Sequence, residues 1–493
     1  MSSLVDAQET DLDMTAASAA VDARGDGKAF TESLFASRFR AVSVGVVSSV
    51  LLVAFEAMAV STAMPVAVAD LHGLPYYSLA FSAYLTLSLL GMVLAGQRAD
   101  ARGPGLPILG GIGLFGAGLL TAGTASSMAQ FVAGRAVQGF GGGMVIVSLY
   151  VLVGRAYPER LHGKAFSVMA SCWVLPSIVG PFVAGVLTEQ VSWRWVFLGA
   201  AVLIVFPLGF LLRPLRELPK LGVEPGSAAT GPNEATGARD QSRLRVVRIC
   251  AALTALGAGL FQFGSQRLDW AGALLMAVAL ALLVPSVPRL LPHGIFRAGR
   301  GLPTVVALRG LLAGAYFGVE AFIPLMLVQE RGLSVTRAGL SLTGAAISWA
   351  TAAWLINRPR VRERYSRARL VRLGCGVTAV ALCGAIAAIS PRTPVWTAAA
   401  AMFLAAFGMG LAFPNISVLT LELSAPGDQG GNAASLQVAD GLSSTVTVAV
   451  AGAVYHALHT SAHADGPVFA LMYGMFIAVA CAAWLVAPRV RVR

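Results

Sequence analysis

The sequence predicts an all-α membrane protein with fourteen transmembrane helices. Of its 493 residues, 56% are hydrophobic and only 12% are charged, whereas a soluble chain carries about 25% charged residues. Many stretches reach the roughly 18–20 residues that cross the apolar layer of a bilayer as a helix. Basic residues gather in short segments between these stretches, as they do in membrane proteins with a fixed orientation.

The N-terminal part of the chain predicts a tail followed by six spans. Residues 1–40 are polar and show no cleavable signal peptide, so we expect a disordered tail before the first helix. A six-helix half then covers residues 41–213. Its predicted spans are 42–66, 75–97, 106–126, 129–154, the stretch between Lys164 and Glu189, and the stretch between Arg194 and Arg213.

The middle of the chain predicts a linker and an inserted pair of helices. Residues 214–245 are rich in Gly, Pro, Ser and charge, which is typical of a flexible linker. Within residues 246–290, two short apolar stretches at 249–266 and 270–288 are long enough to cross. If this pair did not cross, there would be twelve spans and every other segment would keep its side.

The C-terminal part predicts six further spans within residues 301–488. Six helices, a linker and six helices suggest two halves around a central pathway, in the manner of transporters built from repeats. The spans are predicted at 303–328, 338–357, 373–391, 394–421, 431–457 and 466–488.

The distribution of basic residues predicts the orientation. With both termini on one side, that side holds 29 of the 36 Lys and Arg residues, and Arg135 and Arg309 fall within spans. Because cytoplasmic loops carry an excess of Lys and Arg, we expect both termini in the cytoplasm. Lysine occurs only at Lys28, Lys164 and Lys220. This arginine bias is typical of a GC-rich bacterial genome, so we expect the bacterial cytoplasmic membrane.

Several classes of function are disfavoured by composition. The net charge of +12 is spread over loops without interleaved aromatic residues, so we expect no nucleic-acid partner. The five cysteines lie in apolar stretches without a C-x-x-C arrangement, which favours packing over disulfides or metal. His456, His459 and His463 are more typical of a solvated loop than of a metal site. No nucleotide-binding pattern or nucleophile–base set occurs, so we expect neither an enzyme nor a bound cofactor, and no obligate protein partner is evident.

Two sequence patterns fall in the fourth and fifth spans. In FVAGRAVQGFGGG, Arg135 precedes the pair Gln138–Gly139 and a run of glycines that permits close helix approach. In IVGPFVAGVL, Gly180, Pro181 and Gly185 match the pattern G-P-x-x-G-G, with alanine in place of the first paired glycine.

Two further patterns fall in the loop after the second span and in the first span. In GQRADARGPG, Gly96, Asp100 and Gly103 match the loop signature G-x-L-A-D-R-x-G-R-K, and Arg102 lies one residue from the expected arginine. In FEAMAVSTAMPV, Glu56 takes the acidic position of a pattern that continues to Ser61 and Pro65.

Together and in this order, the four patterns resemble the major facilitator superfamily, and the first span resembles its fourteen-helix drug:proton antiporter branch. The resemblance implies two six-helix halves that work by alternating access, with a gating role for the loop at Gly96, Asp100 and Gly103. We therefore expect proton-coupled efflux of lipophilic small molecules, with the proton gradient as energy source. Alternatives are export of a lipid or glycolipid by the same fold, and a non-transporting membrane sensor or scaffold.

Five charged residues fall inside spans, where charge is costly and usually faces a partner or a cavity. Glu56, Arg135 and Glu320 are predicted nearer the outer surface, and Arg309 and Asp440 nearer the inner one. We expect Glu56, Arg135, Glu320 and Asp440 to take part in proton coupling, with Glu56 favoured as the carrier. The alternative is a purely structural role, in which Arg135 forms a fixed ion pair with Glu56 or with Glu320.

The ninth span also carries a polar face. Arg309, Tyr316 and Glu320 are spaced by seven and four residues, which places them near one side of a helix. We expect this side to line the substrate cavity. The arginine-rich segment at 358–372 is predicted to set topology, with contact to anionic membrane lipids as a second role.

Overall fold

A computed structural model describes residues 33–73, 77–217, 234–265, 267, 269–333, 335–425, 427–458 and 465–490. Within these ranges the chain is built of α-helices joined by short turns, without a strand. Most of the predicted tail at 1–40 and the centre of the predicted linker at 214–245 lie outside the description.

The N-terminal half contains the six predicted segments, and proline divides the last two of them. Pro176 and Pro207 each stand just after a break, where proline cannot donate a backbone hydrogen bond and clashes with the carbonyl four residues earlier. The segments are α2 (Arg40–Asp70), α3 (Tyr77–Arg102), α4 (Gly105–Gly123), α5 (Met128–Ala156), α6 (Glu159–Ser171) with α7 (Val174–Gln190), and α8 (Arg194–Leu203) with α9 (Val205–Glu217).

The inserted pair consists of α10 (Glu234–Gly264) and α11 (Trp270–Leu290). Its first helix begins inside the range predicted as linker. The Thr254 and Ser286 hydroxyls, 2.8 Å apart, hydrogen bond between the two helices. The pair packs at the seam between the halves, since Arg248 donates to Gln97 of α3 at 3.1 Å and Ser435 of the C-terminal half donates to the Leu290 carbonyl at 2.6 Å.

The C-terminal half repeats the layout of the first half. Its long helices are α12 (Leu302–Gln329), α13 (Val335–Leu355), α15 (Arg367–Ala387), α16 (Trp396–Glu422), α17 (Gln429–Leu458) and α18 (Gly466–Val486). Three short helices connect or end them, namely η4 (Ile295–Arg297), α14 (Pro359–Arg364) and η5 (Ala487–Val490).

Twelve helices in the described ranges are long and apolar enough to cross a membrane. Both members of the inserted pair are among them, α10 from Arg245 onward. The predicted spans 75–97 and 338–357 coincide with α3 and α13, which are not among these twelve and lie only partly within the residues whose side chains are described. The total of fourteen crossings therefore stays a prediction.

Glycines bring the third and fourth spans of each half into backbone contact. A methyl group at Gly134 of α5 would lie 2.6 Å from the Ala122 backbone nitrogen of α4. In the C-terminal half, a methyl group at Gly408 of α16 would lie 2.7 Å from the Gly374 carbonyl oxygen of α15. Because glycine-mediated contacts join the third and fourth spans in both halves, the two halves are structurally related. In membranes, such close packing is a main source of helix association.

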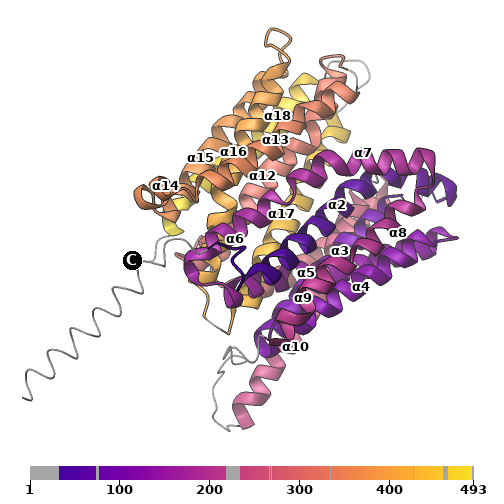
Figure 1. The fold of residues 1–493 in the computed structure, drawn as a ribbon. Coiled ribbons are helices and arrows are strands. Elements are labelled where there is room, and N and C mark those ends of the chain that lie inside the picture. The colour runs from indigo at the N-terminus through magenta and orange to yellow at the C-terminus, as the bar shows by residue number, and fades with distance from the viewer. Residues whose placement is uncertain are drawn as a thin grey trace, which may run out of the picture.

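The two halves meet at one end of the bundle. We call this the basic end, because Arg40, Arg102, Arg155, Arg367 and Arg489 lie there at helix ends. Near α6 and α14 the ribbons of the two halves approach each other (Figure 1). Asn357 of the C-terminal half donates to the Ser167 hydroxyl of α6 at 2.7 Å. Val418 and Leu421 join an apolar cluster of the N-terminal half at the same end.

All five cysteines are free, as predicted. Three of them are buried, in agreement with a packing role. Cys383 and Cys481 are exposed, so for these two the expected internal packing is wrong, since their helix faces lie on the outside of the bundle.

Candidate functional site: buried charges and a gate

Glu56 and Arg135 form a buried ion pair in the N-terminal half. Glu56 on α2 is 1% exposed and Arg135 on α5 is 3% exposed. Arg135 Nη1 donates hydrogen bonds to Glu56 Oε1 and to Gln138 Oε1, the latter at 2.7 Å. The guanidinium lies over the Tyr84 ring of α3, 4.5 Å from its centre. Of the two pairings considered for Arg135, the structure forms the one with Glu56.

This pair has unused hydrogen-bonding capacity. Glu56 Oε2, Arg135 Nε and Gln138 Nε2 are buried and have no partner within the described part of the chain. A buried polar atom without a partner costs about 1–3 kcal/mol. The pair is therefore electrically balanced but incompletely satisfied, which favours an exchange of partners over a permanent clamp.

Arg309 and Asp440 form the corresponding pair in the C-terminal half. Arg309 Nε on α12 donates to Asp440 Oδ2 on α17 at 2.8 Å, and Nη2 lies 2.7 Å from the same oxygen. The guanidinium lies 3.7 Å from the centre of the Phe413 ring. Tyr150 of α5 interacts electrostatically with Arg309, so this pair also reaches the other half.

Glu320 differs from the other two embedded acids. It lies on α12, partly buried, and accepts a hydrogen bond from the Tyr316 hydroxyl at 3.3 Å. No lysine or arginine of the described residues lies within ion-pair distance of it. Since an unpaired buried charge is expensive, the neutral acid is the favoured form of Glu320 in this environment.

The three residues of the predicted polar face of α12 have different neighbours. Tyr316 is 2% exposed and its ring packs against Trp349, 5.7 Å between centres. Arg309 is held by Asp440, whereas Glu320 has only the tyrosine. That these three residues line a substrate cavity stays a prediction.

Asp100 joins the halves at the basic end. It lies near the end of α3, beyond the predicted span 75–97. Its two carboxylate oxygens accept hydrogen bonds from the backbone N–H groups of Gly430 and Gly431, at 2.6 and 2.7 Å. These groups belong to the first turn of α17, where N–H groups have no partner within the helix and carry partial positive charge. Burial raises the pKa of Asp100 to about 6, although these two bonds and the charge of Arg155 lower it.

The other residues of the predicted gating loop have separate roles. Gly96 permits the contact, because a methyl group there would lie 2.5 Å from the Gly430 carbonyl oxygen. Gly103 has a φ of 85°, a left-handed conformation that glycine adopts without strain. Arg102, which lies one residue from the arginine position of the signature, is exposed. Arg155 of α5 is the cation beside this loop, donating to the Ala99 carbonyl at 3.0 Å.

Gly180, Pro181 and Gly185 lie on α7, which packs against α2. A methyl group at Gly180 would lie 3.0 Å from the Met58 Cβ, two residues from Glu56. At Gly185 a methyl group would meet nothing within 4 Å. Of the two glycines of this motif, Gly180 is therefore the one at the helix contact.

The histidines near the end of α17 lie outside what the structure describes: the side chain of His456, and His459 and His463 altogether. In the remainder of the described chain, no group of three His, Cys, Asp or Glu residues could hold a metal ion.

A bundle of two six-segment halves with ion pairs inside each is the architecture of a membrane transporter. The family model of the Major Facilitator Superfamily matches residues 46–448. The chain therefore belongs to this superfamily, and it is a multi-pass membrane transporter and not an enzyme.

Several bacterial relatives carry the names of multidrug transporters. The multidrug transporter protein MdtP of Bacillus subtilis is 23% identical over 420 residues, which cover 84% of this chain and 74% of that protein. A probable multidrug-efflux transporter of Mycobacterium tuberculosis is 24% identical over 428 residues, 85% of this chain and 88% of that protein. Multidrug resistance protein 3 of Bacillus subtilis is 25% identical over 315 residues, and the match spans 58% of its length.

Solved structures share the fold. The human organic anion transporter MFSD10 superimposes with a TM-score of 0.65 at 15% identity, covering 91% of this chain and 99% of that one. The proton:xylose symporter XylE gives 0.60 at 14% identity, covering 90% and 95%. At these identities the likeness concerns the fold alone.

Proposed function

We propose that this protein exports lipophilic small molecules in exchange for protons, by alternating access between its two halves. The observation that carries the proposal is the contrast among the embedded acids. Glu56 and Asp440 are paired with arginines, whereas Glu320 has no cation beside it. Proton binding to one acid and arginine pairing of another can therefore be exchanged as the halves move.

The proposed direction follows from charge. The basic end is assigned to the cytoplasm, because positively charged loops are retained there. Both termini are then cytoplasmic, in a bacterial cytoplasmic membrane. The structure closes this end, so its pathway would open to the outside, where the proton concentration is higher in a respiring cell and Glu320 would take up its proton.

The coupling step is a competition for buried carboxylates. An arginine beside an acid favours its charged form and loss of the cation favours its neutral form. In this conformation Arg135 is paired with Glu56. A movement of α5 against α2 would release Glu56 for protonation, so Glu56, Arg135, Glu320 and Asp440 act as one set, with the proton gradient as energy source.

The substrate class rests on the relatives. Several are named multidrug transporters, which supports lipophilic compounds of varied structure. Export of a lipid or glycolipid is the alternative on the same fold, and it is an outcome of the test below.

The test uses purified protein in liposomes that contain a pH-sensitive dye. With a pH gradient imposed, ethidium should move opposite to protons, and an ionophore that dissipates the gradient should stop it. Glu320→Gln should abolish gradient-driven ethidium movement while leaving exchange of ethidium at equal pH. Gradient-driven transport at the wild-type rate in Glu320→Gln, Glu56→Gln and Asp440→Asn alike would exclude proton coupling through this set. Movement of a fluorescent lipid but not of ethidium would favour the alternative.

A further inference from the structure

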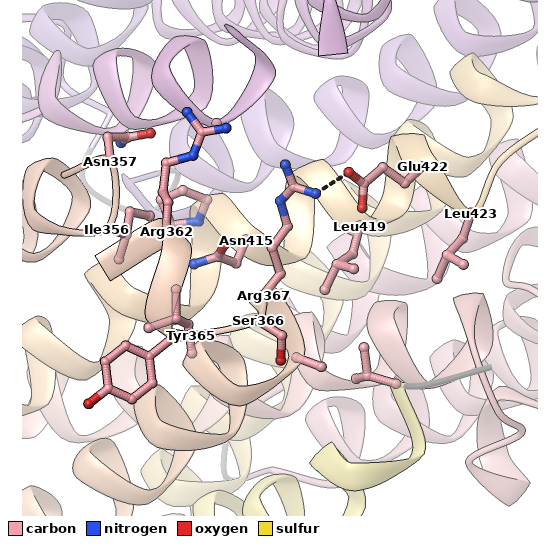
Figure 2. Close-up of a pocket in the computed structure, with 15 residues that line it drawn as sticks. Ile356, Asn357, Arg362, Tyr365, Ser366, Arg367, Asn415, Leu419, Glu422 and Leu423 are labelled. Carbon is pink, nitrogen blue, oxygen red and sulfur yellow. Dashed lines mark hydrogen bonds and ion pairs between the residues drawn. The ribbon is translucent and has the colours of Figure 1, made fainter. Parts of the chain in front are cut away.

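A cavity of about 630 Å³ lies at the basic end, between α6 of the N-terminal half and the turn after α13, α14, α15 and α16 of the C-terminal half. One part of its wall is polar and the other is apolar (Figure 2). The polar part includes Asn357, Arg362, Ser366, Arg367, Asn415 and the carboxylate of Glu422, and the apolar part includes Ile356, Leu370, Leu419 and Leu423.

The polar part of the cavity carries excess positive charge. Arg367 forms an ion pair with Glu422. Arg362 has no carboxylate within ion-pair distance in the part of the chain that the structure describes. Figure 2 shows the two guanidinium groups directed toward the same side of the pocket. Because Arg367 is paired with Glu422, the net positive charge of this wall is that of Arg362, and a bound anion would balance it.

The surroundings place this cavity at the level of lipid headgroups. Trp354 and Trp484 are 56% and 39% exposed on the outside of the bundle. The Arg358 guanidinium lies 3.8 Å from the centre of the Trp354 ring, and that of Arg372 lies 5.3 Å from the Trp484 ring. Exposed tryptophan beside arginine is typical of the boundary between the apolar layer and water. A soluble anion would not require the apolar wall, whereas a lipid would.

We propose that this cavity binds the headgroup of an anionic phospholipid, with its phosphate at Arg362 and Arg367 and the start of an acyl chain on the apolar wall. Gly163 of α6 contributes part of the wall, and the adjacent bond from Asn357 to Ser167 spans the halves. The cavity is therefore complete only while the halves meet at the basic end. A ligand that binds one conformation better shifts the population toward it, so the lipid stabilises the closed basic end.

Native mass spectrometry of the purified full chain tests the site. Phosphatidylglycerol should be retained in preference to phosphatidylcholine with the same acyl chains. Arg362→Gln should lower retention of phosphatidylglycerol by about fivefold, the effect expected for one basic residue at an anionic surface. Arg362 is exposed, so this variant should fold. Arg360→Gln, which makes the same charge change on α14 outside the cavity, should retain phosphatidylglycerol like the wild type.

Three results would overturn the proposal. The first is equal retention of phosphatidylglycerol by the wild type and Arg362→Gln. The second is displacement of the lipid by millimolar inorganic phosphate, which would make this a site for a soluble anion. The third concerns conformation: spin labels at Lys164 and Glu363 should come closer when phosphatidylglycerol is added to phosphatidylcholine nanodiscs, and an unchanged distance would refute the stabilisation of the closed end.

Discussion

At the scale of single residues, the Glu56–Arg135 pair makes a prediction about stability. Removing one partner of a buried ion pair leaves an uncompensated charge and costs about 3–5 kcal/mol. Arg135→Gln should therefore lower the free energy of unfolding by that amount, measured by thermal or denaturant unfolding in detergent. The double variant Glu56→Gln/Arg135→Gln should recover most of the loss, because neither charge remains.

Glu320→Gln serves as the matched control for that experiment, since Glu320 has no arginine to leave behind. It should change stability by less than about 1 kcal/mol. If Arg135→Gln were as stable as the wild type, the pair would contribute nothing to folding, and its role would lie in the transport cycle alone.

Asp100 predicts a dependence of gating on pH. Burial raises its pKa to about 6 in the closed state, whereas a carboxyl exposed to water titrates near 4. The closed state therefore binds the proton more tightly, so closure is favoured as pH falls from about 7 toward 4 and this advantage is lost as pH rises through 6. Distances between labels at Lys164 and Glu363 should shorten over that range.

Asp100→Asn provides the comparison, because asparagine keeps an acceptor oxygen but does not titrate in this range. Its distance profile should be flat between pH 7 and 5. A profile like that of the wild type would assign the pH dependence to a group other than Asp100.

The sequence predicts the embedded charged residues and Asp100, but only some of the groups with which they pair. Charge inside a span identified Glu56, Arg135, Arg309, Glu320 and Asp440, because such residues stand out against apolar surroundings. It left two partners open for Arg135, since helix order does not determine which faces meet. The partners of Asp100 are backbone N–H groups 330 positions away, and a main-chain donor has no side chain by which a sequence can reveal it.

At the scale of helices, hydrophobic length predicted where segments lie but not where they bend. The breaks before Pro176 and Pro207 could have been suspected from proline alone. The early start of α10 could not, because charged residues extend a helix into water as readily as they form a linker.

The inserted pair supplies the prediction at this scale. If α10 and α11 both cross and the basic end is cytoplasmic, the turn after Gly264 lies outside. In a variant without native cysteines, Ser265→Cys should react with a membrane-impermeant thiol reagent in intact cells. Gly427→Cys, exposed in the turn before α17 at the basic end, should react only after lysis. Protection of residue 265 in intact cells would reduce the count to twelve crossings or reverse the orientation.

At the scale of the whole molecule, closure of the basic end predicts that a cross-link between the two halves there stops transport. Asn357 Nδ2 and Ser167 Oγ are 2.7 Å apart across the halves. A short bifunctional thiol reagent should link Ser167→Cys to Asn357→Cys and stop transport, and a reducible reagent should restore it on reduction. Each single cysteine variant is the control, and full transport by the linked protein would show that this contact persists through the cycle.

The contact of Asp100 with α17 has a consequence for how this gate can vary. One side of it is a carboxylate, which a single substitution removes. The other side is the start of α17, where the amides belong to Gly430 and Gly431, and a methyl group at Gly430 would lie 2.3 Å from the Gly96 carbonyl oxygen and 2.9 Å from Asp100 Oδ1. Any side chain at position 430 would therefore push α17 away from α3, so the gate also depends on the absence of a side chain there. Selection on this gate must therefore preserve an acid in one half of the molecule and a glycine in the other.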